Sequence, residues 1–204
     1  MIVIGLTGGS GSGKSTVAQI FKSHNIFCIN ADEIYHDLTA RRSRCLCELA
    51  DEFGEGIISV NGALNREALR EIVFSNAEKL QRLNTIAHYH VLNEIRNILL
   101  TAEKDGYSVA VVDAPQLFES GFNNECDIVV AVTTDVDVRL SRIMQRDALT
   151  RDEALRRIKN QFSDEFFRSH ADYLIVNNGS YSSLLETVSK IISDIKKKKI
   201  KSEG

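Results

Sequence analysis

The segment Gly8-Gly9-Ser10-Gly11-Ser12-Gly13-Lys14-Ser15 follows a short apolar run at residues 2–6, with only Thr7 between them. Its glycines allow the backbone to curl so that several N–H groups point at one anion. Apolar residues at helical spacing after Lys14 predict a helix, and the N-terminus of a helix adds partial positive charge. A strand, a glycine-rich turn and a helix in this order predict an α/β protein that binds phosphate groups.

The two last residues of this segment add chemistry to the turn. Lys14 would place a point charge on the β- and γ-phosphates of a nucleoside triphosphate, and Ser15 offers a hydroxyl to Mg²⁺. A flexible glycine turn without a ligand is the competing interpretation, but it does not require the flanking strand and helix. The pattern therefore predicts a nucleoside triphosphate as ligand.

The rest of the chain predicts five strands that alternate with helices. Apolar runs like that of residues 2–6 recur at residues 26–29, 109–113, 127–132 and 173–176. Continuous apolar runs are typical of parallel strands that are buried on both faces. The fold class expected is an α/β core with a five-stranded parallel sheet flanked by helices.

Two segments interrupt this alternation. Residues 33–106 are mostly helical in pattern, with Asn65 and Asn76 as candidate helix caps, and predict an inserted helical lobe. Residues 139–161 are rich in arginine and predict a helical lid. Thr150-x-x-Glu153 within this segment and Thr134-x-x-Asp137 just before the segment have the pattern of capping boxes, which open helices. The core would then comprise residues 1–32, 107–138 and 162–204.

Arginines of the lid segment share one helix face. Arg139, Arg142 and Arg146 are spaced i, i+3 and i+7, and Arg156 and Arg157 follow after a turn. Guanidinium groups that close over phosphates would stabilise the charge of phosphoryl transfer. A solvated face with surface ion pairs is the alternative for the whole set.

Two aspartates follow predicted strands. Asp32 comes after the second strand and Asp113 ends the third, and ligands of open α/β sheets bind outside the carboxyl ends of strands. A carboxylate there can take a proton from a hydroxyl or hold Mg²⁺ through water. Asp32 could equally be the N-cap of the helix that follows, so its position leaves both interpretations open.

Composition narrows the class of protein further. The chain has 204 residues, is 43% hydrophobic and has a formal charge of −3; without the five lysines at 196–199 and 201 it has 20 basic and 28 acidic side chains. This acidic body argues against a nucleic-acid partner, and the lysine tail is expected to be a solvated helix end or a weak anion contact.

The longest apolar run, residues 128–132, is far shorter than the roughly 20 residues of a membrane span. The four cysteines lack the spacing of a metal site or disulfide framework and predict free thiols in the cytoplasm.

Other motifs carry less weight. His88 and His90 are two apart on a predicted helix, so they cannot chelate one ion together, and His90 is expected to be a structural hydrogen bonder. Asp51-Glu52-Phe53-Gly54 is interpreted as a helix end, and the guanine-reading pattern of GTPases does not occur. The size and segmentation favour a small-molecule kinase.

From residue 4 to about residue 180 the chain resembles the dephospho-coenzyme A kinase family. The resemblance is carried by the glycine-rich loop with Thr16, by Asn30-Ala31-Asp32, Phe53-Gly54, Asn61-Gly62-Ala63-Leu64-Asn65-Arg66, Ile86-Ala87-His88, Asp113-Ala114-Pro115 with Leu117-Phe118-Glu119, Arg142, Arg146, Arg157 and Gln161, Ala171-Asp172-Tyr173 and Asn177-Asn178-Gly179. The chain departs from the family pattern at Tyr89, Gln116 and Ala148, where proline, leucine and glycine are usual.

The resemblance implies transfer of the ATP γ-phosphoryl group to the ribose 3′-hydroxyl of dephospho-coenzyme A, the last step of coenzyme A synthesis. ATP would be held by Gly8, Gly11, Ser12, Gly13, Lys14, Ser15, Thr16 and Arg146, with Mg²⁺ at Ser15. Asp32, Lys14 and Arg142 would be catalytic, and Asp32, Arg66, His88 and Asp113 would contact the acceptor. Another small-molecule P-loop kinase and a silent nucleotide-binding regulator are the alternatives, and the oligomeric state is left open.

Overall fold

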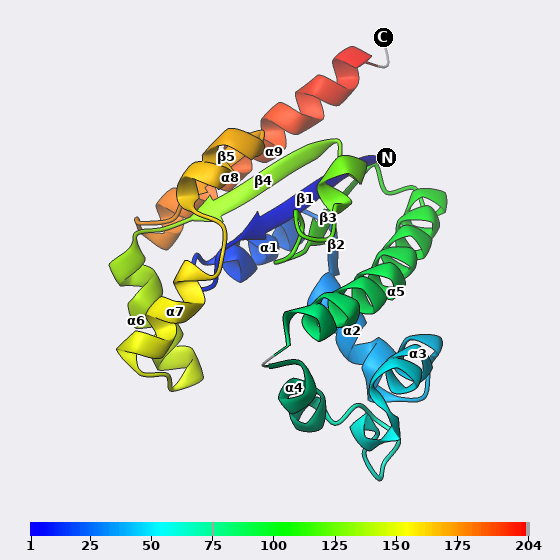
Figure 1. Cartoon of the computed structure of the whole chain (residues 1–204). Helices are drawn as coiled ribbons and strands as arrows, with labels where there is room; N and C mark the ends of the chain where they lie inside the picture. The colour runs from blue at the N-terminus through cyan, green and yellow to red at the C-terminus, as the bar shows by residue number, and fades with distance from the viewer. Residues whose placement is uncertain (75, 203–204) are drawn as a thin grey trace. The chain divides into compact units, whose positions relative to one another are not determined.

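The computed structural model describes residues 1–74 and 76–202, with side chains as far as Lys197 (Figure 1). Its strands are β1 (Ile2–Gly8), β2 (Phe27–Asn30), β3 (Val109–Asp113), β4 (Ile128–Thr133) and β5 (Tyr173–Val176). Its α-helices are α1 (Lys14–Ser23), α2 (Ala31–Ala40), α3 (Arg44–Phe53), α4 (Arg66–Phe74), α5 (Ala77–Lys104), α6 (Val136–Asp147), α7 (Arg151–Lys159), α8 (Asp164–His170) and α9 (Tyr181–Ser202). Short 3₁₀ turns lie at Glu55–Ile57 and Phe122–Glu125.

The five strands form one parallel sheet in the order β2-β3-β1-β4-β5, which confirms the predicted fold class. β1 is central, because Ile4 pairs with Val111 of β3 on one side and with Ile128 of β4 on the other. All residues of β3 and β4 are buried, which explains their continuous apolar sequences. The glycine-rich loop therefore leaves the sheet at its middle strand.

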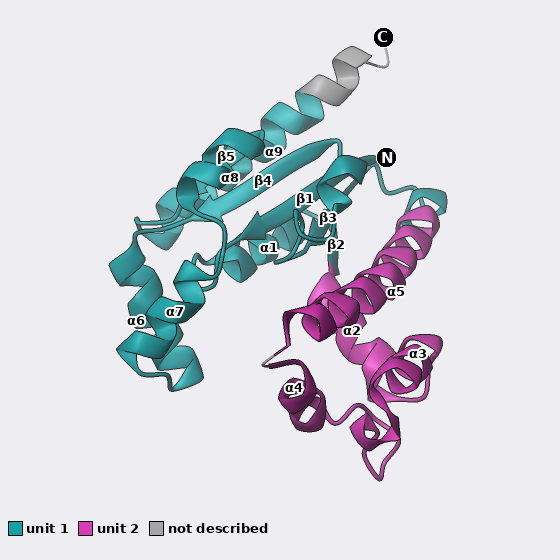
Figure 2. Ribbon diagram, in the orientation of Figure 1, with its two compact units in different colours: residues 1–29, 102–204 teal, residues 30–101 magenta. Residues whose placement is uncertain are grey.

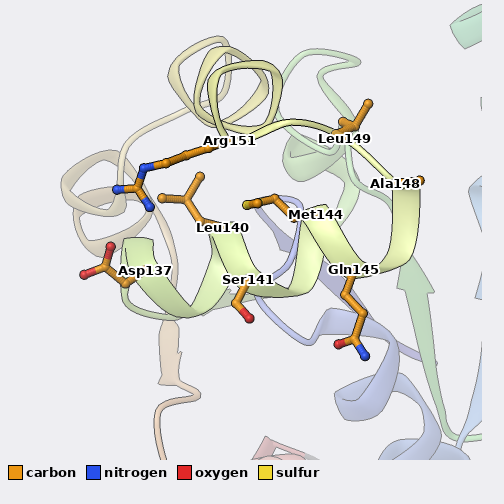
Figure 3. Close-up of a pocket in the computed structure, with 8 residues that line it drawn as sticks. All are labelled: Asp137, Leu140, Ser141, Met144, Gln145, Ala148, Leu149 and Arg151. Carbon is orange, nitrogen blue, oxygen red and sulfur yellow. The ribbon is translucent and has the colours of Figure 1, made fainter.

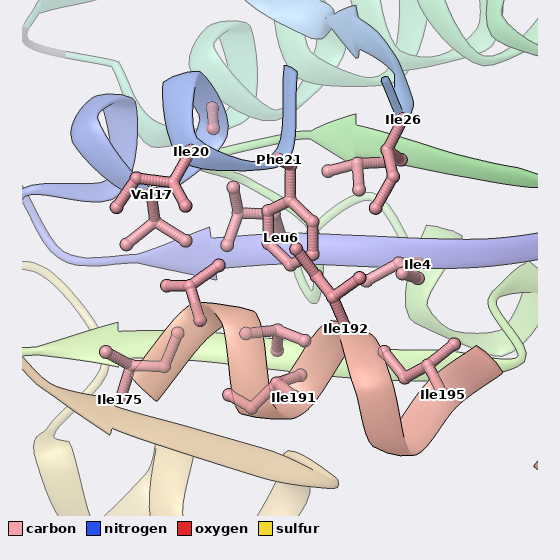
Figure 4. Close-up of a cluster of buried hydrophobic side chains, with 14 of the residues drawn as sticks. Ile4, Leu6, Val17, Ile20, Phe21, Ile26, Ile175, Ile191, Ile192 and Ile195 are labelled. Atoms are coloured by element: carbon pink, nitrogen blue, oxygen red, sulfur yellow. The ribbon is translucent and has the colours of Figure 1, made fainter. Parts of the chain in front are cut away.

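The main core lies between the sheet and two helices. Figure 4 shows Val17, Ile20 and Phe21 of α1 and the isoleucines of α9 around Ile4 and Leu6 of β1. Phe21, Ile4 and Leu6 have no exposed surface. This packing fixes α1 against β1, and with it both ends of the loop that joins them.

Contacts divide the chain into two compact units (Figure 2). The first comprises residues 1–29 and 102–204, and the second comprises residues 30–101. The second unit has a core of its own, formed by Cys45, Leu49, Ile57, Leu69, Val73 and Ile86. The arginine-rich segment 139–161 lies within the first unit.

Helices α6 and α7 pack against each other through Leu140, Ile143 and Ala154. A shallow groove of about 650 Å³ lies along the α6 side of this pair, with Leu140, Met144 and Leu149 among its lining residues (Figure 3). Its rim is polar, with Asp137, Ser141, Gln145 and Arg151. On α6, the lining residues lie on the helix face opposite to Arg139, Arg142 and Arg146.

The predicted helix caps are mostly confirmed. Thr150 and Glu153 form a reciprocal capping box, and the Asn65 and Asn76 side chains accept hydrogen bonds from Ala68 N and Lys79 N. The capping box predicted at Thr134 is wrong. The N-cap of α6 is Asp135, and its side chain makes no capping bond. Thr134 does not cap the helix, because its hydroxyl donates to Asn177 O at 2.7 Å and to Asn178 Oδ1 at 2.6 Å.

The predictions for Gly54, for the helix around Tyr89 and for the cysteines are also confirmed. Gly54 is the C-cap of α3, with φ 92°, and α5 continues through Tyr89 where the family pattern has proline. All four cysteines are free. Helix α9 includes the lysine-rich segment, with Lys196 and Lys197 exposed, while the side chains of Lys198, Lys199 and Lys201 lie outside the described residues. No helix in the described part of the chain is long and apolar enough to span a membrane.

Ala148 ends α6 in the left-handed conformation, with φ 52° and ψ 34°. This conformation costs a residue with a Cβ about 1–2 kcal/mol, which glycine avoids. The substitution Ala148→Gly removes that cost but adds about 0.4–1 kcal/mol of unfolded-chain entropy. We expect the free energy of unfolding to stay constant or to rise by up to about 1 kcal/mol, measured by urea denaturation.

Ala154→Gly is the matched control, because Ala154 is fully buried inside α7. It should lower the free energy of unfolding by about 1–2 kcal/mol, since it removes a buried methyl group and weakens the helix. A loss of stability at position 148 equal to that at position 154 would contradict the strain assigned to Ala148.

Candidate active site

The loop between β1 and α1 has the shape of an anion cradle. Gly11 and Gly13 have φ values of 79° and 93°, and Gly13 is the N-cap of α1. The first N–H groups of a helix usually have no acceptor within the helix. In α1 the Thr16 N–H donates to Gly13 O at 3.0 Å, whereas no bond from the N–H groups of Lys14 and Ser15 is found among the described residues, so these two are available to an anion. The macrodipole of α1 adds positive charge at the same place.

Lys14 lies in this cradle beside a buried carboxylate. The Lys14 ammonium group forms an ion pair with Asp113 at the end of β3. Asp113 is 6% exposed, and β3 is the neighbour of β1 in the sheet. The structure thus brings together Lys14 and Asp113, which the sequence separates by 99 residues.

The hydroxyl groups of the loop differ in their surroundings. Ser12 is 1% exposed, and its Oγ has no hydrogen-bond partner among the described residues. Ser15 is exposed at the start of α1, and Thr16 is half-buried. A buried hydroxyl without a partner costs free energy, so the loop contains a polar atom that a bound ligand can satisfy.

The predicted arginine face is confirmed for α6 only. Arg142 Nη1 donates to Gly11 O at 3.1 Å, and Arg146 Nη2 donates to Ser10 Oγ at 3.1 Å. Arg139 also contacts the loop. The structure does not bring Arg156 and Arg157 to the loop: Arg156 is exposed on α7, and Arg157 forms an ion pair with Asp147.

Asp32 lies in the first turn of α2 but does not cap it. Asn30 is the N-cap, and its Oδ1 accepts hydrogen bonds from the amides of Asp32 and Glu33 at 3.0 and 3.3 Å. The interpretation of Asp32 as a cap is therefore wrong. Asp32 is exposed, and within the described part of the chain no hydrogen bond to its carboxylate is found.

Arg66 begins α4 and is held by two residues of α2. Its Nη2 lies 3.1 Å from His36 Nδ1, and its guanidinium carbon lies 5.9 Å from the centre of the Tyr35 ring. Arginine can only donate, so His36 accepts through Nδ1 and carries its proton on Nε2. These contacts orient the guanidinium of Arg66 within the second unit.

The two histidines of α5 have different surroundings. His90 Nε2 lies 2.7 Å from Glu48 Oε2, which confirms the prediction that it is a structural hydrogen bonder. His88 is half-buried on the same helix. No group of three or more potential metal ligands from His, Cys, Asp and Glu occurs among the described residues.

Asn177 bonds the glycine-rich loop, a role that its sequence pattern does not predict. Its Nδ2 donates to Ser12 O at 2.8 Å, and it is 7% exposed at the end of β5. The neighbouring Asn178 accepts from Asp135 N at 2.9 Å. Two adjacent carboxamides after a strand were the available signal, but a turn explains an Asn-Asn-Gly sequence equally well.

A parallel sheet with a phosphate-binding loop after its central strand, and with arginines of a following helix on that loop, defines a P-loop kinase. The shikimate kinase of Acinetobacter baumannii shares this fold, with a TM-score of 0.57 at 18% identity over 98% of this chain and 95% of its own. The family model for dephospho-CoA kinase matches residues 2–183. The chain belongs to the dephospho-CoA kinase family, whose members are ATP-dependent kinases.

Individual relatives support this assignment. The dephospho-CoA kinases of Corynebacterium glutamicum and Fusobacterium nucleatum are each 38% identical over 96% of this chain and cover 98% and 99% of their own length. The structure of the Campylobacter jejuni dephospho-CoA kinase superposes with a TM-score of 0.71 at 28% identity, covering 97% of this chain and 98% of that one.

The pKa of Asp147 depends on its contacts with Arg146 and Arg157. Hydrogen bonds from Arg146, together with one from Arg157, lower the pKa of Asp147 to about 2. A lowered pKa stabilises the fold at pH values above the unfolded pKa, near 3.8, and this stabilisation is lost as the pH falls through 2. We expect the Asp147 carboxyl to titrate near pH 2 in an NMR titration of the nucleotide-free protein.

Arg146→Met should raise the pKa of Asp147 toward 3.8, because it removes the larger of the two causes. Arg151→Met is the control, since Arg151 is exposed on α7 and makes no bond to Asp147. Titration of Asp147 near pH 3.8 in the unsubstituted protein would contradict the assigned ion pairs.

Proposed function

We propose that this chain transfers the γ-phosphoryl group of ATP to the ribose 3′-hydroxyl of dephospho-coenzyme A, giving coenzyme A and ADP. The observation that carries this proposal is the loop at residues 8–15, which combines Lys14, the N-terminus of α1 and two arginines of α6. Membership of the dephospho-CoA kinase family supports the choice of acceptor.

The loop residues Gly8, Gly11, Ser12, Gly13, Lys14, Ser15 and Thr16 would hold the ATP phosphates. The N–H groups at the start of α1 bind phosphate oxygens, and the Ser12 hydroxyl gains the partner it lacks. Arg142 and Arg146 move their donors from the loop to the phosphates, where guanidinium groups stabilise the charge that spreads over the transferred oxygens.

The residues present fit a Mg²⁺ ion that is bound together with ATP. Mg²⁺ is usually held by one or two protein oxygens plus phosphates and water, not by a dedicated cluster of protein ligands. The exposed Ser15 hydroxyl at the start of α1 is such an oxygen, and the Asp113 carboxylate lies next to Lys14 in the same unit. Ser15 would hold the ion, which supplies neutralisation of phosphate charge when it is bound.

Asp32 would be the base or orienting group for the acceptor. Its carboxylate would accept the proton of the 3′-hydroxyl while that oxygen forms a bond to the γ-phosphorus, and the bond from the γ-phosphorus to the β-phosphate oxygen breaks to release ADP. Because Asn30 caps α2, the Asp32 carboxylate is not needed for the helix. Arg66, His88 and Asp113 would contact the acceptor.

The direct test incubates the purified protein with Mg-ATP and dephospho-coenzyme A and detects coenzyme A and ADP by mass spectrometry. Formation of both products at rates typical of enzymes supports the proposal. ADP without coenzyme A would retain the kinase class and reject the acceptor. Bound ATP without ADP would indicate a regulator that has lost turnover.

Lys14→Ala should lower the rate of phosphoryl transfer by orders of magnitude, because it removes the cation aimed at the β- and γ-phosphates. It also leaves Asp113 without its ion-pair partner, so circular dichroism and the thermal midpoint should be measured beside kcat. A folded Lys14→Ala protein with nearly unchanged kcat would refute the role of the loop.

Asp32→Asn should lower kcat by roughly 10²-fold or more, since general-base catalysis contributes about 10²–10⁴-fold. The affinity for ATP and the thermal midpoint should change little. Asp37→Asn is the matched control, because Asp37 is an exposed aspartate on the same helix. Equal kcat values for the two variants would show that the base lies elsewhere, with Asp113 as the next candidate.

A further inference from the structure

Three successive carbonyl groups of the phosphate-binding loop are each bonded to a side chain from the C-terminal half of the chain. Arg139 Nε donates to Ser10 O at 3.0 Å, Arg142 Nη1 donates to Gly11 O at 3.1 Å, and Asn177 Nδ2 donates to Ser12 O at 2.8 Å. Carbonyl oxygens carry negative partial charge and would repel phosphate. Each donor fixes the direction of the carbonyl group to which it bonds. Because Arg142 is proposed to turn to the phosphates, Arg139 and Asn177 are the donors that remain when ATP binds.

Arg139 and Gln161 together bond the backbone N–H and C=O of Ser10, which belong to the two peptide groups on either side of its Cα. Gln161 Oε1 accepts from Ser10 N at 2.9 Å and from Arg139 Nη2 at 2.8 Å. The Ser10 amide and carbonyl are therefore both bonded to a connected pair of side chains. A planar guanidinium suits this arrangement, because its fixed donors reach two acceptors at once.

The surroundings of Arg139 are those of a structural cation. It is 3% exposed, and burial lowers its pKa while Asp164, 3.8 Å from Nη1, counteracts this effect. Gly9 provides the space for it, since a Cβ at Gly9 would collide with the Arg139 guanidinium. All of these contacts lie within the first unit.

We propose that Arg139 and Gln161 are positioning residues that set the nucleotide-binding shape of the loop before ATP arrives. They do so by fixing the directions of the two peptide groups that flank the Cα of Ser10, not by touching the nucleotide. A loop that is already shaped loses less conformational freedom on binding. Arg139 thus differs in role from Arg142 and Arg146, which lie on the same helix face. The inference rests on the ATP-binding role proposed above.

The test measures the dissociation constant of a non-hydrolysable ATP analogue with Mg²⁺ by calorimetry, on the full chain. Arg139→Met keeps much of the side-chain volume but cannot donate, and Gln161→Leu cannot accept. Each should raise the dissociation constant about tenfold, and KM for ATP should rise with it. The KM for dephospho-coenzyme A should stay within twofold, and kcat at saturating ATP should fall less than KM rises.

The double variant should raise the dissociation constant by less than the product of the two single effects, because the two side chains are bonded to each other and act on the backbone of one residue, Ser10. Arg168→Met is the matched control, since Arg168 is an exposed arginine of α8, and it should bind the analogue like the unsubstituted protein. If Arg139→Met does not fold, Gln161→Leu alone decides the question.

Unchanged analogue affinity in folded Arg139→Met or Gln161→Leu protein, even with a lowered thermal midpoint, would overturn the inference and leave the proposed function intact. A raised KM for dephospho-coenzyme A with normal analogue affinity would also overturn it. Failure of the unsubstituted protein to bind the analogue would instead overturn the proposed function, and the inference with it.

Discussion

An anion can enter the loop at residues 8–15 only if N–H groups point into it and carbonyl oxygens point away. Three carbonyl groups of this loop meet donors from Arg139, Arg142 and Asn177, so the loop depends on parts of the chain more than 120 residues distant. The parallel sheet makes this possible, because all its strands end on the same side, so the loop after β1, helix α6 after β4 and Asn177 after β5 lie at one edge of the sheet. Lys14 and Asp113 are brought together in the same way.

The sheet, the helical insertion and the loop could be predicted because they depend on local patterns: apolar runs, helical spacing and a contiguous motif. The interactions that shape the loop could not be predicted, because their partners meet only in the folded chain. In the sequence, Asn177 resembles a turn residue and Thr134 resembles a helix cap. In the structure, the Thr134 hydroxyl donates instead to Asn177 O and Asn178 Oδ1. Arg157 matched the predicted arginine-rich lid as well as Arg142 and Arg146 did, but in the structure it forms an ion pair with Asp147.

Asp32 shows how a structure separates two roles that a sequence leaves combined. A carboxylate at the start of a helix is both a favoured cap and a possible base. Asn30 fulfils the first role with two amide hydrogen bonds, so the exposed carboxylate of Asp32 does not cap the helix. Arg66 lies in the same unit as Asp32 and is oriented by His36 and Tyr35, which gives the second unit an anchored cation of its own.

The central position of β1 has a consequence for synthesis on the ribosome. β1 leaves the exit tunnel before its neighbours in the sheet, residues 109–113 and 128–133, and Asn177 comes later still. The nascent chain must therefore carry an apolar strand without strand partners until residues 109–113 have been translated. Pairings this distant in sequence form slowly and expose apolar surface in the meantime. The loop proposed to bind phosphate is thus translated well before the residues that complete its shape.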